Sequence, residues 1–261
     1  MKRSKITILL AIVLGMTFHS CLDLEPQDQL GGKNMWTSVN DYKQFANTFY
    51  SWTRDFSSVV YDGTHSDKRS DLITYQSYNE FSRGINSIPS SDANYTDNYK
   101  HIRRTNLLLQ NAEAYAKPED IKQYIGEAYF FRAYSYFDLL QLYGDVIITK
   151  KPLDITDPEM KVKRNDRSEV VDLIIDDLNH AVENLPAFKE LTTEEEGRIS
   201  KEGAQAFLSR VALYEGTWQK SRNGNQNTQR SANLLDIAAK AARTVIDAKY
   251  GYTFPIVWNR Q

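Results

Sequence analysis

Residues 119–145, EDIKQYIGEAYFFRAYSYFDLLQLYGD, decide the fold of this chain. No proline interrupts the stretch. Pro118 comes just before it and is followed by two acidic residues, a typical start of a helix. Gly144 stands at its other end, where glycine commonly terminates a helix. The sequence therefore predicts one long helix over residues 119–143.

This helix is apolar around most of its circumference. At about 100° per residue, its polar positions fall in one narrow stripe, formed by Gln123, Glu127, Asp138 and Gln141. Such a helix must be surrounded by other elements. It is too polar to span a bilayer, because Glu127, Arg132 and Asp138 would each lie in hydrocarbon. We expect it to be the central helix of a helical domain.

Composition and the absence of catalytic motifs limit the kinds of function that this protein could have. The chain has 261 residues, 41% of them hydrophobic, and a formal net charge of −2, which gives no electrostatic case for binding nucleic acid. The sequence contains no glycine-rich phosphate loop, nucleophile elbow or zinc-ligand spacing, although Asp62, His65 and Asp67 could meet a cation. We therefore expect no catalytic residues, no metal site and no cofactor, and a protein that is not an enzyme.

The segment 126–154 carries a specific pattern. It reads Gly-Glu-Ala, then Arg-Ala, Tyr-Phe-Asp-Leu, Leu-Tyr-Gly-Asp-Val and Pro-Leu. This pattern resembles the hallmark of the SusD/RagB family, and residues 197–216 fit a second block of that family. These are outer-membrane lipoproteins that capture glycans for a TonB-dependent (SusC-like) porin. The resemblance implies a mostly α fold of tetratricopeptide-like helical hairpins with long irregular loops.

The N-terminus supports export. Lys2, Arg3 and Lys5 precede an apolar run, as in a signal peptide, and Cys21 is the only cysteine of the chain. We expect residues 1–20 to be a lipoprotein signal peptide and Cys21 to carry the outer-membrane lipid anchor; the alternative is a secretory peptide cleaved elsewhere. Residues 21–35 are then a lipidated tether. We expect residues 36–261 to form the N-terminal helical domain of the family. Because members of the family are longer, we expect this domain to be truncated at its C-terminus.

The candidate ligand surface lies in residues 54–98, the least regular part of the sequence. Loops on a rigid scaffold are where binding groups concentrate. Tyrosine rings can stack on a pyranose, and carboxylate or guanidinium forks can bind vicinal hydroxyls. The candidates for contact with a glycan ligand are Asp67, Arg69, Asp71, Tyr75, Tyr78, Asn79 and Tyr95. The alternative is a solvated loop whose tyrosines pack locally.

Further helices are expected around this core, over residues 41–52, 98–115, 168–185, 200–216 and 232–249. We expect Ser168 to cap the third of these. Asp172, Asp176 and Asp177 are expected on its solvated face, and residues 219–230 as a polar insert. Asn106 is expected to serve packing or capping rather than ligand binding.

Three functions remain in order of preference. The first is a cell-surface glycan-binding lipoprotein that delivers oligosaccharide, or another nutrient such as a peptide, to a TonB-dependent transporter. The second is a helical-repeat interaction module that binds no small molecule. The third is a surface glycoside hydrolase.

Overall fold

The computed structural model describes residues 35–54, 80, 83–222 and 228–248. The chain divides into two units, Met1–Met35 and Trp36–Gln261, and every described helix belongs to the second. These helices are α2 (Val39–Asn47), α3 (Ala93–Glu113), α4 (Lys122–Tyr143), α5 (Arg167–Asn184), α6 (Lys201–Arg222) and α7 (Thr228–Asp247). The described residues form no strand, only a single bridge between Val146 and Asn165.

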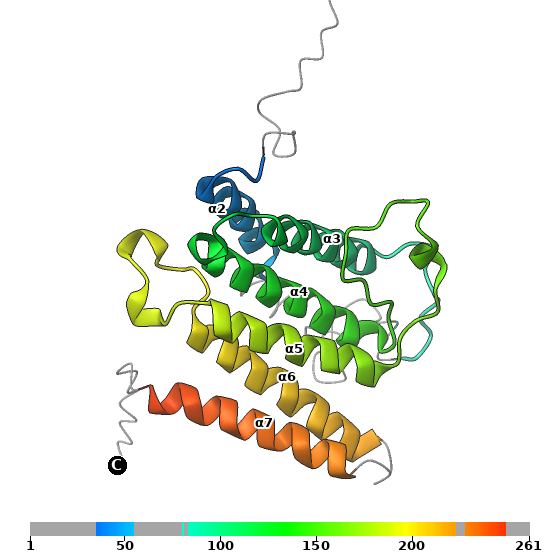
Figure 1. Ribbon diagram of the computed structural model, residues 1–261. Helices are drawn as coiled ribbons and strands as arrows, with labels where there is room; N and C mark the ends of the chain where they lie inside the picture. Colours follow the sequence, from blue (N-terminus) through cyan, green and yellow to red (C-terminus); the bar gives the residue numbers. More distant parts are fainter. Residues whose placement is uncertain (1–34, 55–79, 81–82, 223–227, 249–261) are drawn as a thin grey trace, which may run out of the picture. The chain divides into compact units, whose positions relative to one another are not determined.

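From α3 onward, each helix packs against the next helix of the sequence. Figure 1 shows α3 to α7 running back and forth as a stack of hairpins. The helix α2 and the 3₁₀ turn after it, Thr48–Trp52, cover the start of this stack and contact α4. The predicted fold class, mostly α with tetratricopeptide-like helical hairpins, is confirmed.

The helix α4 is the central element that its sequence predicts. Its buried residues face all directions, as expected for a helix enclosed by α2, α3, α5 and α6. Residues Pro118–Ile121 form a 3₁₀ turn, so the α-helix itself starts later than predicted, at Lys122. Gly144 ends it with φ of 73°, a conformation that favours glycine. Gly126 allows close packing, since a Cβ there would lie 2.9 Å from the Leu185 side chain.

An ion pair buried at the centre joins α4 to α5. The Arg132 guanidinium donates from Nε and Nη2 to the two carboxylate oxygens of Asp177, at 2.8 and 2.6 Å. Its Nη1 donates to Oδ1 of Asn106 on α3, at 2.8 Å. All three side chains are buried, and these hydrogen bonds provide partners for their desolvated polar groups. Three consecutive helices are thereby fixed to one another.

Two further arginine–carboxylate pairs join other layers of the stack. The fully buried Glu127 of α4 accepts from Arg198, which precedes α6, at 2.7 and 2.6 Å. The fully buried Glu215 of α6 accepts from Nε of Arg167, the first residue of α5, at 2.9 and 3.2 Å. Buried charges of this kind need a matched partner, because desolvation without one costs several kcal/mol.

The expectation that Asp177 lies on the solvated face of its helix is wrong. Asp177 is fully buried against Arg132, while Asp172 and Asp176 are exposed. A step of one residue turns a helix by about 100°, which is enough to carry Asp177 from the outer face to the α4 side.

Two other predicted details also differ. The helix α5 begins at Arg167 with Asp166 as its N-cap, so Ser168 is not the cap. The expected polar insert is shorter, because α6 continues to Arg222 and α7 starts at Thr228. Buried polar contacts explain this: Gln219 donates to Glu215 at 2.7 Å, within α6.

Among the described helices, none is long and apolar enough to cross a membrane.

Candidate functional site

The structure places one of the seven predicted ligand residues. Tyr95 lies on α3, and the other six lie outside the described residues: Asp67, Arg69, Asp71, Tyr75, Tyr78 and Asn79. Cys21, the predicted lipidation site, also lies outside them.

The sequence places Tyr95 in an irregular region. In the structure it belongs to a helix. The helix α3 starts at Ala93, five residues earlier than predicted, because Asp92 caps it. The Asp92 carboxylate accepts from the backbone N–H of Asn94 at 2.9 Å. Tyr95 therefore has a fixed position in the first turn of α3.

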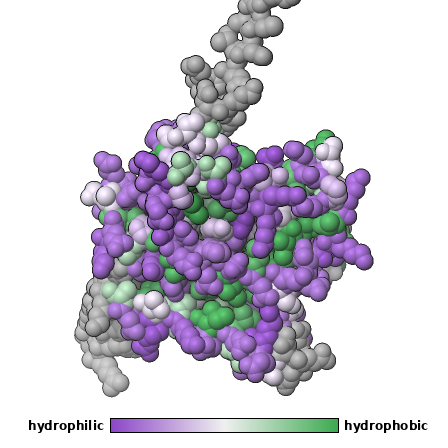
Figure 2. All heavy atoms as spheres, in the orientation of Figure 1, coloured by the Kyte–Doolittle hydropathy of each residue, from purple (hydrophilic) through white to green (hydrophobic). Residues whose placement is uncertain are grey.

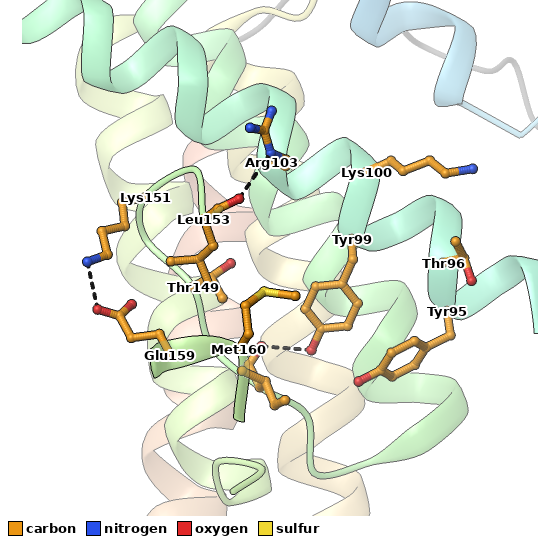
Figure 3. A pocket seen from close by; sticks show the side chains of 11 residues that line it. Tyr95, Thr96, Tyr99, Lys100, Arg103, Thr149, Lys151, Leu153, Glu159 and Met160 are labelled. Carbon is orange, nitrogen blue, oxygen red and sulfur yellow. Dashed lines mark hydrogen bonds and ion pairs between the residues drawn. The ribbon is translucent and has the colours of Figure 1, made fainter. Parts of the chain in front are cut away.

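A pocket of about 490 Å³ opens beside Tyr95. One wall is the outer face of α3, and the other is the connection between α4 and α5 (Figure 3). Its lining is mainly apolar and aromatic, with charged side chains around it: Tyr95, Thr96, Tyr99, Lys100 and Arg103 from α3, and Ile147, Thr149, Lys151, Leu153, Glu159 and Met160 from the connection. We call this the α3 pocket. Its size is within the usual range for small-molecule sites.

The connection is tied to the helices through its backbone carbonyls. The Tyr99 hydroxyl donates to the carbonyl of Ile147 at 2.8 Å. The Asn106 amide donates to the carbonyls of Thr149 and Lys151 at 3.0 and 3.3 Å. The same Asn106 accepts from the buried Arg132, so the wall of the pocket is anchored to the central ion pair. The predicted packing role of Asn106 is confirmed.

Three tyrosine rings meet at Tyr95, and two of them, Tyr95 and Tyr99, belong to the pocket lining. The Tyr95 ring lies 4.8 Å from that of Tyr99 and 5.2 Å from that of Tyr143, between ring centroids. Tyr143 donates to the Asp92 carboxylate at 2.7 Å, which links the cluster to the α3 cap. All three rings are half-buried, so each offers an apolar face next to water. Such rings suit ligands that have one apolar and one polar side.

The pKa of the Tyr99 phenol is raised, and burial is the largest cause. The phenol therefore stays protonated and remains a donor to the carbonyl of Ile147. The ring of Tyr99 can still present its face to the pocket (Figure 3).

Charged side chains surround this apolar lining. Lys151 pairs with Glu159 within the connection, at 2.7 Å. Lys100 pairs with Asp97 one turn earlier on α3, at 2.8 Å. Arg103 donates from Nε to the carbonyl of Leu153 at 3.4 Å and so links α3 to the connection.

Sequence reasoning missed most of the α3 pocket. Tyr99 is expected from sequence only as part of the helix over residues 98–115, and no ligand role is expected for residues 146–160. The available signal was the spacing of Tyr95 and Tyr99, four residues apart, which places both rings on one helical face. Nothing local in the sequence indicates that the connection folds back over that face.

The site offers little for acid–base or metal chemistry. The described part of the chain holds no cluster of three or more histidine, cysteine or acidic side chains that could bind a metal ion. Its fully buried carboxylates, Glu127, Asp177 and Glu215, are each engaged by an arginine. The arrangement is suited to binding a ligand.

Comparisons with known proteins agree with one another. A SusD-like family model, described as "Starch-binding associating with outer membrane", matches residues 22–213. SusD-like protein P38 of Formosa agariphila is 28% identical over 233 residues, which cover 82% of this chain and 42% of that protein. SusD-like protein P2 of the same organism is 28% identical over 238 residues, covering 85% and 45%.

Solved structures show the same fold. A SusD-like protein from Bacteroides fragilis superposes with a TM-score of 0.62 at 23% identity, over 86% of this chain and 41% of that one. The present chain thus spans less than half the length of each of these three relatives.

Proposed function

The chain belongs to the SusD-like family, whose description is starch-binding and associating with the outer membrane, and we propose from this premise that it is a glycan-capturing lipoprotein of the cell surface. The α3 pocket is the observation that carries the proposal for this chain. It combines a rigid wall, half-buried tyrosine rings and apolar side chains at the edge of a helical scaffold. Sugars present an apolar C–H face and a rim of hydroxyls, which match such a surface.

Tyr95 is the proposed stacking residue. The sequence indicates Tyr95 as a ligand candidate, and its ring lines the α3 pocket and contacts the rings of Tyr99 and Tyr143. The remaining candidates precede α3 in the sequence and are proposed as hydrogen-bonding and stacking partners on the same ligand surface: Asp67, Arg69, Asp71, Tyr75, Tyr78 and Asn79.

We further propose that Cys21 carries the lipid anchor. Thioether and amide-linked acyl chains provide the two or more anchors that stable membrane attachment requires. Cys21→Ser should abolish labelling by a fatty-acid probe and release the protein from the membrane fraction. Unchanged labelling would contradict the anchor.

Delivery to a TonB-dependent transporter is the last step of the proposed function. A binding protein tethered by lipid lies at high local concentration near any membrane partner. Co-purification of such a transporter with the lipidated protein from membranes would support this step, and its absence from gently solubilised membranes would count against it.

The function is tested with a glycan array probed with the full-length protein. We expect retention of at least one soluble oligosaccharide, with the oligosaccharide recovered intact. Release of shorter products would favour a surface glycoside hydrolase instead.

A groove between α5 and α7 favours a second candidate, the interaction module. It measures about 660 Å³ and is lined by Asp172, Ile175 and Asp176 of α5 and by Arg230, Asn233 and Ile237 of α7, among others. Figure 2 shows hydrophobic side chains on the molecular surface in this part of the stack. Stacked helical hairpins use such concave surfaces for protein partners. A protein that binds no glycan on the array but still retains a membrane partner would support this candidate.

A further inference from the structure

We propose that the α3 pocket selects a negatively charged sugar, one that carries a carboxylate or a sulfate ester. This inference rests on the proposed function and names the class of glycan that the site would take. Three observations carry it: the scarcity of carboxylate and amide acceptors in the lining, the set of cations around it, and the geometry of Arg103.

The lining is poor in acceptors for sugar hydroxyls. Its one carboxylate, Glu159, is engaged by Lys151 at 2.7 Å, and its residues include no asparagine, glutamine or histidine. The Tyr99 hydroxyl is already directed to the carbonyl of Ile147. A neutral sugar needs several acceptors and donors to replace its lost water, since an unmatched buried hydroxyl costs roughly 1–3 kcal/mol. Apart from the hydroxyls of Tyr95, Thr96 and Thr149, which can donate or accept, this pocket provides mainly donors.

Those donors are cationic. Lys100, Arg103 and Lys151 line the pocket against the single carboxylate of Glu159, in a chain whose formal net charge is −2. Lys100 and Arg103 extend from α3, and Lys151 extends from the connection on the opposite side (Figure 3). Lys100 is paired with Asp97 and Lys151 with Glu159, so the net positive charge of the lining rests on Arg103.

Arg103 has the geometry of an anion anchor. Its Nε donates to the carbonyl of Leu153 at 3.4 Å, which holds the guanidinium beside the connection. Its two terminal nitrogens make no hydrogen bond or ion pair with another described residue. A guanidinium fork binds a carboxylate or sulfate through two parallel hydrogen bonds. Lys100 and Lys151 pair with exposed acids, and exposed pairs of this kind exchange partners at little cost.

The apolar walls complete the match to a sugar. Leu153 and Met160 of the connection line the pocket, and Figure 3 shows Met160 beside the Tyr99 ring. A pyranose could place its C–H face on these side chains while its acidic substituent points to Arg103. A simple anion such as phosphate would use the cations but not the apolar walls.

The test compares three oligosaccharides of the same backbone and length: one neutral, one carrying uronic acids and one carrying sulfate esters. Isothermal titration with the full-length protein should give at least about tenfold tighter binding for an acidic form than for the neutral form. That preference should weaken as sodium chloride is raised, because salt screens exposed charges. Stronger binding of the uronate or of the sulfated form would tell which acid the site takes.

Arg103→Gln should remove most of the preference while leaving thermal unfolding unchanged, since Arg103 is exposed. Arg243→Gln is the matched control, because Arg243 is an exposed arginine of α7 outside the pocket lining. Lys151→Gln tests the cation on the opposite side of the pocket and should also reduce the preference for the acidic oligosaccharide.

The two possible failures are distinguishable. Equal affinity for all three oligosaccharides, unaffected by Arg103→Gln, would overturn the inference and leave the proposed function standing. Binding of none of the glycans on the array or in the titration would contradict the proposed function itself.

Discussion

At the scale of single residues, the hydrogen-bonded group of Arg132, Asp177 and Asn106 connects the core to the candidate site. Arg132 fixes α4 to α5 through Asp177, and Asn106 continues the network to the carbonyls of Thr149 and Lys151 in the pocket wall. The pocket shape thus depends on a charge pair that lies in the interior of the molecule.

Removing one partner of the Arg132–Asp177 pair should lower the stability of the protein strongly. Asp177→Ala leaves the Arg132 guanidinium buried without its carboxylate, and we expect a loss of about 3–5 kcal/mol in the free energy of unfolding. The matched control is Asp176→Ala, because Asp176 is the exposed neighbour on the same helix and should change stability by less than about 0.5 kcal/mol. Urea denaturation measures both. Equal, small losses would show that the Arg132–Asp177 pair does not hold the helices together.

The sequence could not distinguish these two neighbouring acids. Three aspartates close together on an amphipathic helix are normally solvated. The sequence of α5 alone does not tell which of them contacts a buried arginine. The partner is 45 residues away on another helix, so only the packed structure identifies the pair. Glu127 and Glu215 are buried for the same reason, with partners at Arg198 and Arg167.

At the scale of elements, hydrophobic periodicity predicted every long described helix, and the differences lie at the helix ends. Caps made by Asp92 and Asp166 moved the starts of α3 and α5, while α6 extended past the expected end into a segment with polar composition. Periodicity reports which face is buried, whereas the end of a helix depends on a few hydrogen bonds that composition does not reveal. The central position of α4 was predictable because so little of its circumference is polar.

The packing of α4 against α6 gives a direct test of that central position. Phe137 is 4% exposed and its ring meets those of Phe207 and Tyr214, at 5.6 and 5.4 Å between centroids. Phe137→Ala should leave a cavity and lower the free energy of unfolding by about 3–5 kcal/mol. Phe188→Ala, at a phenylalanine that is 43% exposed, is the control and should have a much smaller effect. Similar midpoints of thermal unfolding for both variants would mean that α4 is not the core element.

At the scale of the whole domain, α3 to α7 form a stack in which each helix contacts its sequence neighbours. A stack of this kind carries its variable features on connections, and the α3 pocket is formed where one connection returns to an earlier helix. The sequence indicated the family and Tyr95 as a ligand candidate, although it placed Tyr95 in an irregular region before the helix. It did not indicate the return of residues 146–160, because the contacts that hold them, such as Asn106 to Thr149, join segments 43 residues apart.

Isothermal titration of Tyr95→Ala tests most directly the proposal that a glycan binds at the α3 pocket through Tyr95. The ligand is the best oligosaccharide from the array, and the control is Tyr115→Ala, a half-buried tyrosine beyond the other end of α3. Loss of one stacking ring should weaken binding by about 1 kcal/mol, or roughly fivefold. We expect Tyr95→Ala to bind at least that much more weakly while Tyr115→Ala binds as the unaltered protein does. Unchanged affinity in Tyr95→Ala, with the fold intact, would contradict the account.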